Sequence, residues 1–294
     1  MSRSLLVIVT VALVGAATVV DAQTALSDRT SVRADGEVAE GSIRLATDTG
    51  LAALAVWFET TANPLRCTWC DRDQTGRDTL NGLDRAVRDA WLWAPSHRQR
   101  AATLSSILEY SLIGGGLVWS ALARPGGTAI AEPSAASPSA VDRWNGVSAV
   151  VEALGGSAAL TGTFKRAAAR ERPWAHFREP VGPGNPNDSF VSGQTSQSFA
   201  VATAVGVLCH DRHCRRETAT WVVGLVTASA TGYLRIAADK HYMTDVLAGA
   251  GVGVLSGVAV PALGNRVWNA GPTRTVVAPV VVPAGVAFRS TWTW

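Results

Sequence analysis

The chain has 294 residues, of which 47% are hydrophobic and 17% are charged, and its formal net charge is +3. This length suits one large domain or two small ones. So mild a positive charge does not indicate the strong basic patch that nucleic-acid binding demands, and we expect no nucleic-acid partner.

The N-terminus is typical of an export signal. One basic residue precedes the apolar run LLVIVTVALVGAATVV, and VDA supplies residues that are permitted before cleavage after Ala22. We therefore predict a signal peptide over residues 1–22 and an exported protein, either periplasmic or secreted. Because the apolar run is slightly long, an uncleaved membrane anchor is the alternative.

Four cysteines form two local pairs, Cys67 and Cys70 in CTWC and Cys209 and Cys214 in CHDRHC. In an oxidising compartment such pairs predict two disulfides. A metal site is the alternative for the second pair, because two histidines lie between its cysteines. A redox role for CTWC is weaker, because no thioredoxin-like βαβ pattern surrounds it. We predict both disulfides and no bound metal.

Hydrophobic periodicity and the proline and glycine breaks predict an all-α fold. After a loose polar segment over 23–44, we expect helices over 45–62, 80–93, 101–123, 141–172, 195–208, 217–235 and 241–263. The fourth of these helices has a potential break at Gly155-Gly156. A linker over 126–140 and a proline-rich loop over 174–191 connect them. About seven helices thus form one domain over 45–265, and the tail over 266–294 is β-prone, which is compatible with a hairpin.

Two of the predicted helices could be membrane spans. Residues 218–234 and 246–264 lack charges and approach the length of a span. However, small residues dominate over Leu and Ile, Glu109 and Glu152 interrupt other candidates, and the core helices of a large bundle are also apolar on all sides. We therefore favour a water-soluble or peripherally membrane-associated bundle over an integral one.

The segment KRAAARERP carries two cations that suit a phosphate. Lys165 and Arg172 are seven residues apart, which places both on one face of a helix. Pro173 disfavours helix at Arg172, so that its guanidinium lies at the helix end and can donate paired hydrogen bonds to phosphate oxygens. Taken alone, the segment also fits a solvated basic helix face.

The segment SFVSGQTSQSFA places Ser192 and Gly193 in a loop before a predicted helix. Glycine permits a close approach of the backbone, and the N–H groups at a helix start attract an anion. A simple helix cap is the alternative interpretation.

The segment YLRIAADKHYMTDVLAGA contains Arg235, His241 and Asp245. His241 and Asp245 are four residues apart, so that they are neighbours on a helix start. A carboxylate beside an imidazole fixes its tautomer and leaves the other ring nitrogen free to attack. The alternative is a helix cap with an incidental pair.

In chain order the segments read K-x6-R-P, S-G-x and R-x5-H-x3-D, and the combination is far more specific than any one of them. Over roughly residues 140–262 it resembles the type 2 phosphatidic acid phosphatase and vanadium haloperoxidase superfamily. The resemblance implies a helical bundle with its site at helix ends. It also implies a phosphate cradle that consists of Lys165, Arg172, Ser192, Gly193 and Arg235.

The resemblance further implies that His241, oriented by Asp245, is the nucleophile and forms a phosphohistidine that water cleaves. This chain departs from the family pattern twice, with Val191 where the family has proline and Gln194 where it has a histidine. That histidine serves as general acid for the leaving group, and glutamine cannot supply a proton near neutral pH. Loss of a general acid typically costs about 10²- to 10⁴-fold in rate. His176 is a candidate substitute, although an unrelated loop histidine is the simpler interpretation.

We therefore expect an exported phosphatase that acts on phosphomonoesters or lipid phosphates, needs no cofactor and is impaired at the general-acid step. A non-catalytic phosphate- or phospholipid-binding protein is the alternative from another class. A vanadate-dependent haloperoxidase, which shares the cradle, is the third interpretation.

Overall fold

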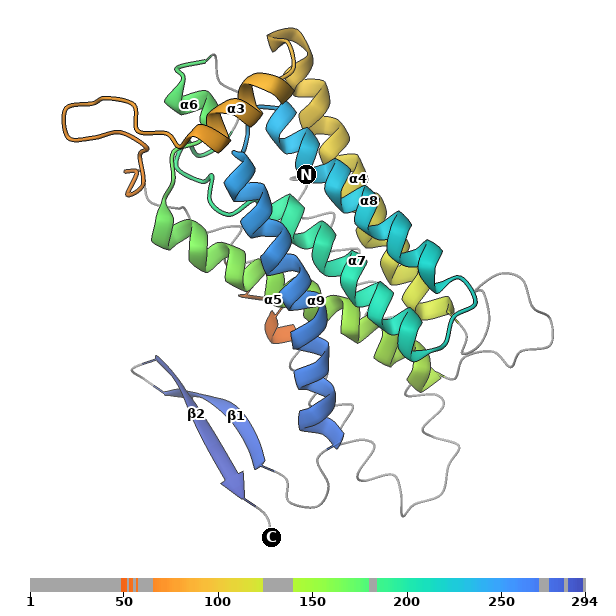
Figure 1. Cartoon of the computed structure of the whole chain (residues 1–294). Coiled ribbons are helices and arrows are strands. Elements are labelled where there is room, and N and C mark those ends of the chain that lie inside the picture. Colours follow the sequence, from red (N-terminus) through yellow and green to blue (C-terminus); the bar gives the residue numbers. More distant parts are fainter. Residues whose placement is uncertain are drawn as a thin grey trace, which may run out of the picture. The chain divides into compact units, whose positions relative to one another are not determined.

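A computed structural model describes residues 49–51, 53–54, 57, 66–123, 140–179, 184–269, 275–282 and 285–292. The signal peptide, the segment over 23–44 and most of the linker predicted from the sequence lie outside these residues. The chain divides into two units, Met1–Pro261 and Ala262–Trp294. The described part of the first unit is all-α, which confirms the predicted fold class (Figure 1).

Seven helices have described bounds. They are α3 (Gly82–Trp91), α4 (Pro95–Leu122), α5 (Ala140–Ala168), α6 (Pro173–His176), α7 (Gly193–Asp211), α8 (Glu217–Ala237) and α9 (Met243–Asn269). Six of them follow the order predicted from 80–93 onward, whereas α6 lies mostly in the stretch predicted as a loop, and the helix predicted over 45–62 lies mostly outside the described residues. Pro95 starts α4 rather than only ending the helix before it, because the missing N–H of proline is no loss in a first helical turn.

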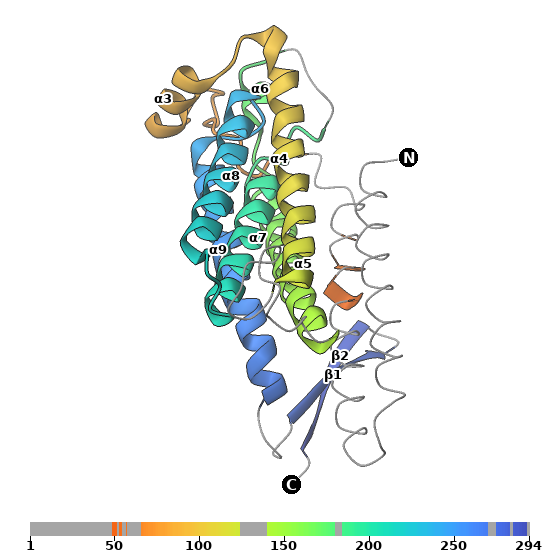
Figure 2. The same ribbon diagram turned by 90° about the vertical axis from the view of Figure 1, so that its right-hand side faces the viewer.

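Helix α7 packs against α4, α5 and α8, and two perpendicular views show these long helices running side by side (Figures 1 and 2). The apolar core between α4, α5 and α7 consists of Ile113, Leu117, Val147, Val150, Ala153, Ala200, Val201, Ala204 and Val205. Helix α5 continues through Gly155-Gly156, where the sequence had suggested a break. A side chain at Gly156 would meet Val260 of α9 at 2.7 Å, so this glycine permits close helix packing.

Three glycines at a spacing of four let α9 lie directly against α7. An added Cβ would come within 2.6 Å of the Ser192 carbonyl oxygen at Gly249 and within 2.7 Å of the Ala200 carbonyl oxygen at Gly257, and Gly253 between them is similarly crowded. This close approach brings the starts of both helices together, where the Ser192 N–H donates to the Asp245 carbonyl oxygen at 3.0 Å.

The described surface of the helical unit carries many large hydrophobic side chains. Among the described residues, three helical segments are long and apolar enough to cross a membrane, namely Pro95–Leu122, Arg143–His176 and Met243–Leu263. Only 33% of the most apolar stretch of the first and 28% of the third are buried within the protein. The exposed side chains include Ile107, Val118, Leu122, Val222, Val223, Val226, Leu247, Val254, Leu255 and Val258.

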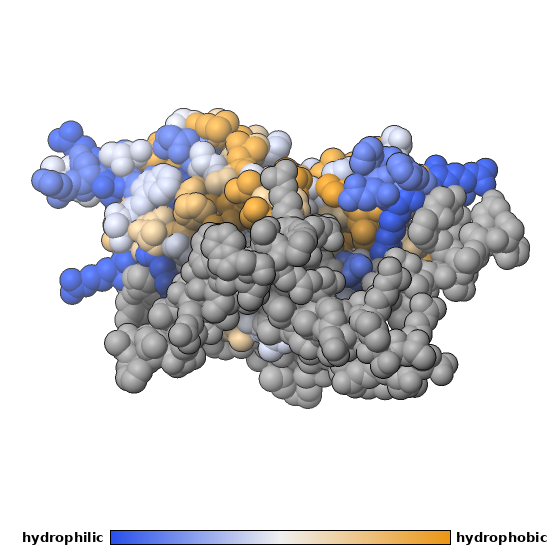
Figure 3. All heavy atoms as spheres, turned by 90° about the horizontal axis from the view of Figure 1, so that it is seen from below, coloured by the Kyte–Doolittle hydropathy of each residue, from blue (hydrophilic) through white to orange (hydrophobic). Residues whose placement is uncertain are grey.

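Hydrophobic side chains accordingly gather at the described surface in Figure 3. The expectation of a water-soluble or peripheral bundle assumed that these apolar helices were buried by one another. The exposed faces of α4, α8 and α9 speak against that expectation.

The second unit contains an antiparallel pair of strands in the β-prone tail. Strand β1 (Thr275–Val282) pairs with β2 (Gly285–Trp292) in a register that runs from Thr275 opposite Trp292 to Val282 opposite Gly285.

The two cysteine pairs differ in the structure. Cys67 and Cys70 are joined by a disulfide, whereas Cys209 and Cys214 are free thiols, so the second predicted disulfide is absent. Cys209 is buried near the end of α7, where its thiol contacts the Thr220 hydroxyl at 3.7 Å. Among the described residues, no group of three or more His, Cys, Asp and Glu side chains is arranged so that it could hold a metal ion.

Candidate active site

The two cations of the first segment meet on one carboxylate. Lys165 lies in the last turn of α5, and Arg172 lies four residues beyond the helix end, as the cap of α6. Lys165 Nζ and Arg172 Nη2 both donate to Asp188 Oδ2, at 3.0 and 3.1 Å. Asp188 could not be predicted as a site residue, because a lone loop aspartate in a proline-rich stretch carries no motif.

Two further donor groups of Arg172, Nε and Nη1, bind the backbone of neighbouring segments. Its Nε donates to the Asn185 carbonyl oxygen at 3.0 Å, and its Nη1 donates to the Lys240 carbonyl oxygen at 3.1 Å. Lys240 directly precedes His241, so Arg172 connects the first predicted segment to the third.

The second segment lies beside Lys165, as α7 begins at Gly193 with Ser192 as its buried cap. A Cβ added at Gly193 would lie 3.8 Å from Lys165 Nζ. The Ser192 hydroxyl shares a hydrogen bond of 2.8 Å with the Thr195 hydroxyl. The start of α7, where backbone N–H groups favour an anion, is therefore close to the cationic side chains.

Arg235 reaches the same region from the last turn of α8. Its Nη1 donates weakly to the Ser105 hydroxyl of α4 at 3.4 Å, and its buried Nε has no acceptor among the described residues. A buried donor without an acceptor is costly in a folded protein. An incoming anion would supply the missing acceptor.

The imidazole of His241 is 3% exposed and is held by a backbone carbonyl rather than by Asp245. Its Nδ1 donates to the Ser189 carbonyl oxygen at 2.8 Å, whereas Asp245 Oδ2 lies 3.8 Å away, too far for a hydrogen bond. The direct bond expected from the spacing of four does not form, because α9 begins at Met243, after His241.

Asp245 acts on His241 indirectly. Its Oδ2 accepts hydrogen bonds from the Ser189 hydroxyl at 2.5 Å and from the Tyr242 N–H at 2.9 Å. Ser189 in turn positions His241 through its carbonyl oxygen. The tautomer is still fixed, because a carbonyl oxygen can only accept, so that the Nδ1 proton is retained and Nε2 keeps a free lone pair.

Burial, together with the nearby cations Arg172 and Arg235, holds the pKa of the His241 imidazole well below its usual range. The ring is therefore neutral near neutral pH. A neutral imidazole with a free lone pair at Nε2 is suited to nucleophilic attack.

Gln194 has no amide proton left for a ligand. Its Nε2 donates to Glu109 Oε2 at 2.6 Å and to the Ser106 hydroxyl at 3.1 Å, and its Oε1 accepts from the Ser105 hydroxyl at 3.1 Å. An amide nitrogen carries two protons, and α4 takes both. The side chain thus ties α7 to α4.

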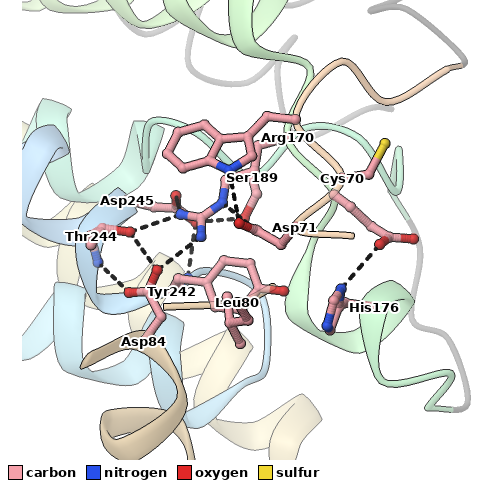
Figure 4. A network of polar contacts seen from close by, with 12 residues as sticks. Cys70, Asp71, Leu80, Asp84, Arg170, His176, Ser189, Tyr242, Thr244 and Asp245 are labelled. Carbon is pink, nitrogen blue, oxygen red and sulfur yellow. Dashed lines mark hydrogen bonds and ion pairs between the residues drawn. The ribbon is translucent and has the colours of Figure 1, made fainter. Parts of the chain in front are cut away.

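A buried arginine that no sequence motif indicated, Arg170, lies among the carboxylates of the polar network in Figure 4. Arg170 is fully buried, and its guanidinium lies 4.2 Å from the ring centroids of both Trp69 and Tyr242. It makes ion pairs with three carboxylates, Asp71 at 2.9 Å, Asp84 at 2.8 Å and Asp245 at 2.7 Å. We call these four charged residues the Arg170 cluster. The cluster fixes the carboxylate that positions Ser189.

His176, the candidate substitute acid, faces other groups. It is buried in α6, with Nδ1 3.3 Å from Glu171 Oε2 and Nε2 3.3 Å from Asp78 Oδ1. Figure 4 shows it at some distance from Arg170, on the far side of Asp71. The described contacts of His176 are with these carboxylates and not with Gln194.

Comparison with known proteins finds a family match over the region that contains this site. Residues 146–269 match the model of the PAP2 superfamily, and this stretch contains all three segments. The match agrees with the resemblance that the motifs predicted.

One curated relative is the lipid A 1-phosphatase of Porphyromonas gingivalis, which is 40% identical over 74 residues. The match spans 25% of this chain and only 16% of the length of that relative. Two solved structures are similar at lower identity. Aquifex aeolicus LpxE is 20% identical, with a TM-score of 0.43 over 63% of this chain and 93% of that one. A transmembrane PAP2-type phosphatidylglycerolphosphate phosphatase from Bacillus subtilis is 16% identical, with a TM-score of 0.45 over 76% and 96%.

Proposed function

We propose that this protein is a membrane phosphatase that hydrolyses phosphomonoesters, with lipid phosphates as its substrate class. The observation that carries the proposal is the convergence of Lys165, Arg172 and Arg235 on the buried neutral imidazole of His241. Three cations around a nucleophile suit a phosphoryl group, whose negative charge they stabilise during transfer.

In the first step, His241 Nε2 forms a bond to phosphorus while the bond from phosphorus to the ester oxygen breaks. The Nδ1–H bond to the Ser189 carbonyl stabilises the imidazolium character that develops. In the second step, a water oxygen attacks phosphorus, the bond between phosphorus and nitrogen breaks, and phosphate leaves. Protons from the water pass to solvent.

The departing ester oxygen needs a proton in the first step, and Gln194 cannot give one. Both amide protons of Gln194 are bound to α4, and an amide is no acid near neutral pH. We therefore propose an enzyme that is impaired at the general-acid step. The same observation favours the alternative of a phosphate-binding protein that lacks turnover.

A lipid substrate fits the exposed apolar faces of α4, α8 and α9, and it fits the activity named for the Porphyromonas gingivalis relative. We expect the chain to stay in the membrane fraction through an alkaline carbonate wash and to leave it only with detergent. Release by the wash alone would contradict integration into the bilayer.

Phosphate release from a panel of aryl, alkyl and lipid phosphomonoesters tests the function. The detergent-extracted chain should release phosphate from at least the aryl esters, and His241→Ala should abolish release without loss of inorganic phosphate binding. Binding of phosphate without release from any ester would support the binding protein instead. If neither binding nor release occurs, both interpretations are wrong.

A further inference from the structure

The carboxylate of Asp188 occupies the cationic site in this structure. Its Oδ2 accepts from Lys165 Nζ at 3.0 Å and from Arg172 Nη2 at 3.1 Å. One oxygen atom therefore engages both cations of the first segment. The Asp188 side chain is 18% exposed, so that it has a route from the site towards solvent.

An anion that binds Lys165 Nζ and Arg172 Nη2 competes with this oxygen. Two other donor groups of Arg172 are already bound to the carbonyl oxygens of Asn185 and Lys240, and Nη2 faces Asp188. The donor groups that the two cations turn towards a ligand are thus shared with Asp188.

Asp188 is a competitor that does not diffuse away, because the next residue is anchored. The Ser189 N–H donates to the Arg170 carbonyl oxygen at 3.1 Å, and its hydroxyl donates to Asp245. A tethered group acts at a high effective concentration. Burial raises the pKa of the Asp188 carboxyl, but Lys165 and Arg172 outweigh it and hold that pKa below its usual range, so the competitor is charged.

We propose that Asp188 is a specificity-determining residue that selects phosphomonoester dianions over phosphodiesters, an inference that rests on the proposed phosphatase function. A phosphodiester carries one charge and two unesterified oxygens, so it offers Lys165 and Arg172 little more than Asp188 already does. A phosphomonoester offers about two charges and three acceptor oxygens. The third oxygen is available to Arg235, whose buried Nε has no acceptor among the described residues.

This selection suits an enzyme in a bilayer, because the surrounding phospholipids present phosphodiesters at high density. Without the carboxylate, two strong cation donors would be open to any anionic headgroup. When Asp188 is present, a phosphodiester that replaces its carboxylate at Lys165 and Arg172 gains no binding energy. A phosphomonoester dianion that replaces it brings one more charge and one more hydrogen-bond acceptor.

Calorimetric titration of the detergent-extracted full chain tests the inference with two probes, inorganic phosphate and dimethyl phosphate, at about pH 8, where the former is largely doubly charged. Wild type should prefer inorganic phosphate strongly. Asp188→Asn should tighten dimethyl phosphate about 10-fold and reduce the preference by a similar factor, the size expected for one hydrogen bond to a charged group. Asp89→Asn, an exposed aspartate of α3, is the matched control and should change neither affinity.

Asp188→Glu keeps the charge and should retain most of the preference, whereas Asp188→Ala should lose it as Asp188→Asn does. An unchanged ratio of the two affinities in folded Asp188→Asn or Asp188→Ala overturns the inference. The proposed function fails separately, if Arg172→Ala binds inorganic phosphate as tightly as wild type.

Discussion

Gln194→His is expected to raise the hydrolysis of alkyl phosphates by about 10²-fold or more and that of aryl phosphates by much less. A phenolate of low pKa departs without a proton, so aryl esters depend little on a general acid. An alkoxide is a poor leaving group, and wild type should therefore be nearly inert towards alkyl and lipid phosphates. The measurement is kcat/KM for a matched pair of aryl and alkyl esters.

The surroundings of position 194 favour this gain. Glu109 Oε2 lies 2.6 Å from the Gln194 amide nitrogen, so an imidazole placed there would meet a carboxylate that stabilises its protonated form. Glu109→Gln should reduce the gain when it is combined with Gln194→His. His241→Ala should remove activity on both esters in either background.

Gln99→His, at an exposed position of α4, is the control for an added histidine. If wild type hydrolyses alkyl phosphates as fast as aryl phosphates, another group supplies the proton, and the idea of an impaired acid step is wrong. If neither wild type nor Gln194→His hydrolyses either ester, the site binds phosphate without transferring it.

Arg170→Met is expected to lower the free energy of unfolding by about 3–5 kcal/mol, the usual cost of breaking a buried ion pair. The substitution keeps much of the side-chain volume, but it leaves Asp71, Asp84 and Asp245 buried without their common cation. Denaturation of the purified protein in detergent measures the change. Arg170→Lys should recover part of the loss, because it keeps the charge but lacks the planar fork that spans three carboxylates.

Arg85→Met is the matched control. Arg85 pairs with Asp78 at a surface where the two side chains are 41% and 33% exposed, and exposed pairs contribute little to stability. A loss at Arg170 no larger than the loss at Arg85 would contradict the structural role of the Arg170 cluster. Folded Arg170→Lys should also show a lower kcat with little change in KM, because the cluster acts on His241 through Asp245 and Ser189.

Local patterns in the sequence predicted the helices and the three segments well, because hydrophobic period and proline breaks are local signals. They failed where a tertiary contact decided the outcome. Gly155-Gly156 suggested a break, yet Gly156 serves the packing of α5 against Val260. The spacing of His241 and Asp245 suggested a direct bond, yet α9 starts two residues after the histidine.

Local sequence patterns could not predict the Arg170 cluster. Its carboxylates are 99, 86 and 75 residues from Arg170 along the chain, and no periodicity connects positions so far apart. Asp188 was missed because its role depends on two cations that only the fold brings together. Composition could not decide between a soluble and a membrane-associated bundle, because it counts apolar residues but cannot tell which of them face outward.

The Arg170 cluster also determines how much of the chain must be kept together for an intact catalytic core. The matched family region begins at residue 146, yet two of the three carboxylates around Arg170 come from Asp71 and Asp84, and the partners of Gln194 come from α4. A fragment that began at residue 146 would leave the buried guanidinium of Arg170 with only one of its three carboxylate partners, Asp245. The segment that carries the Cys67–Cys70 disulfide and Trp69, which packs against Arg170, is therefore part of the structure that supports the site.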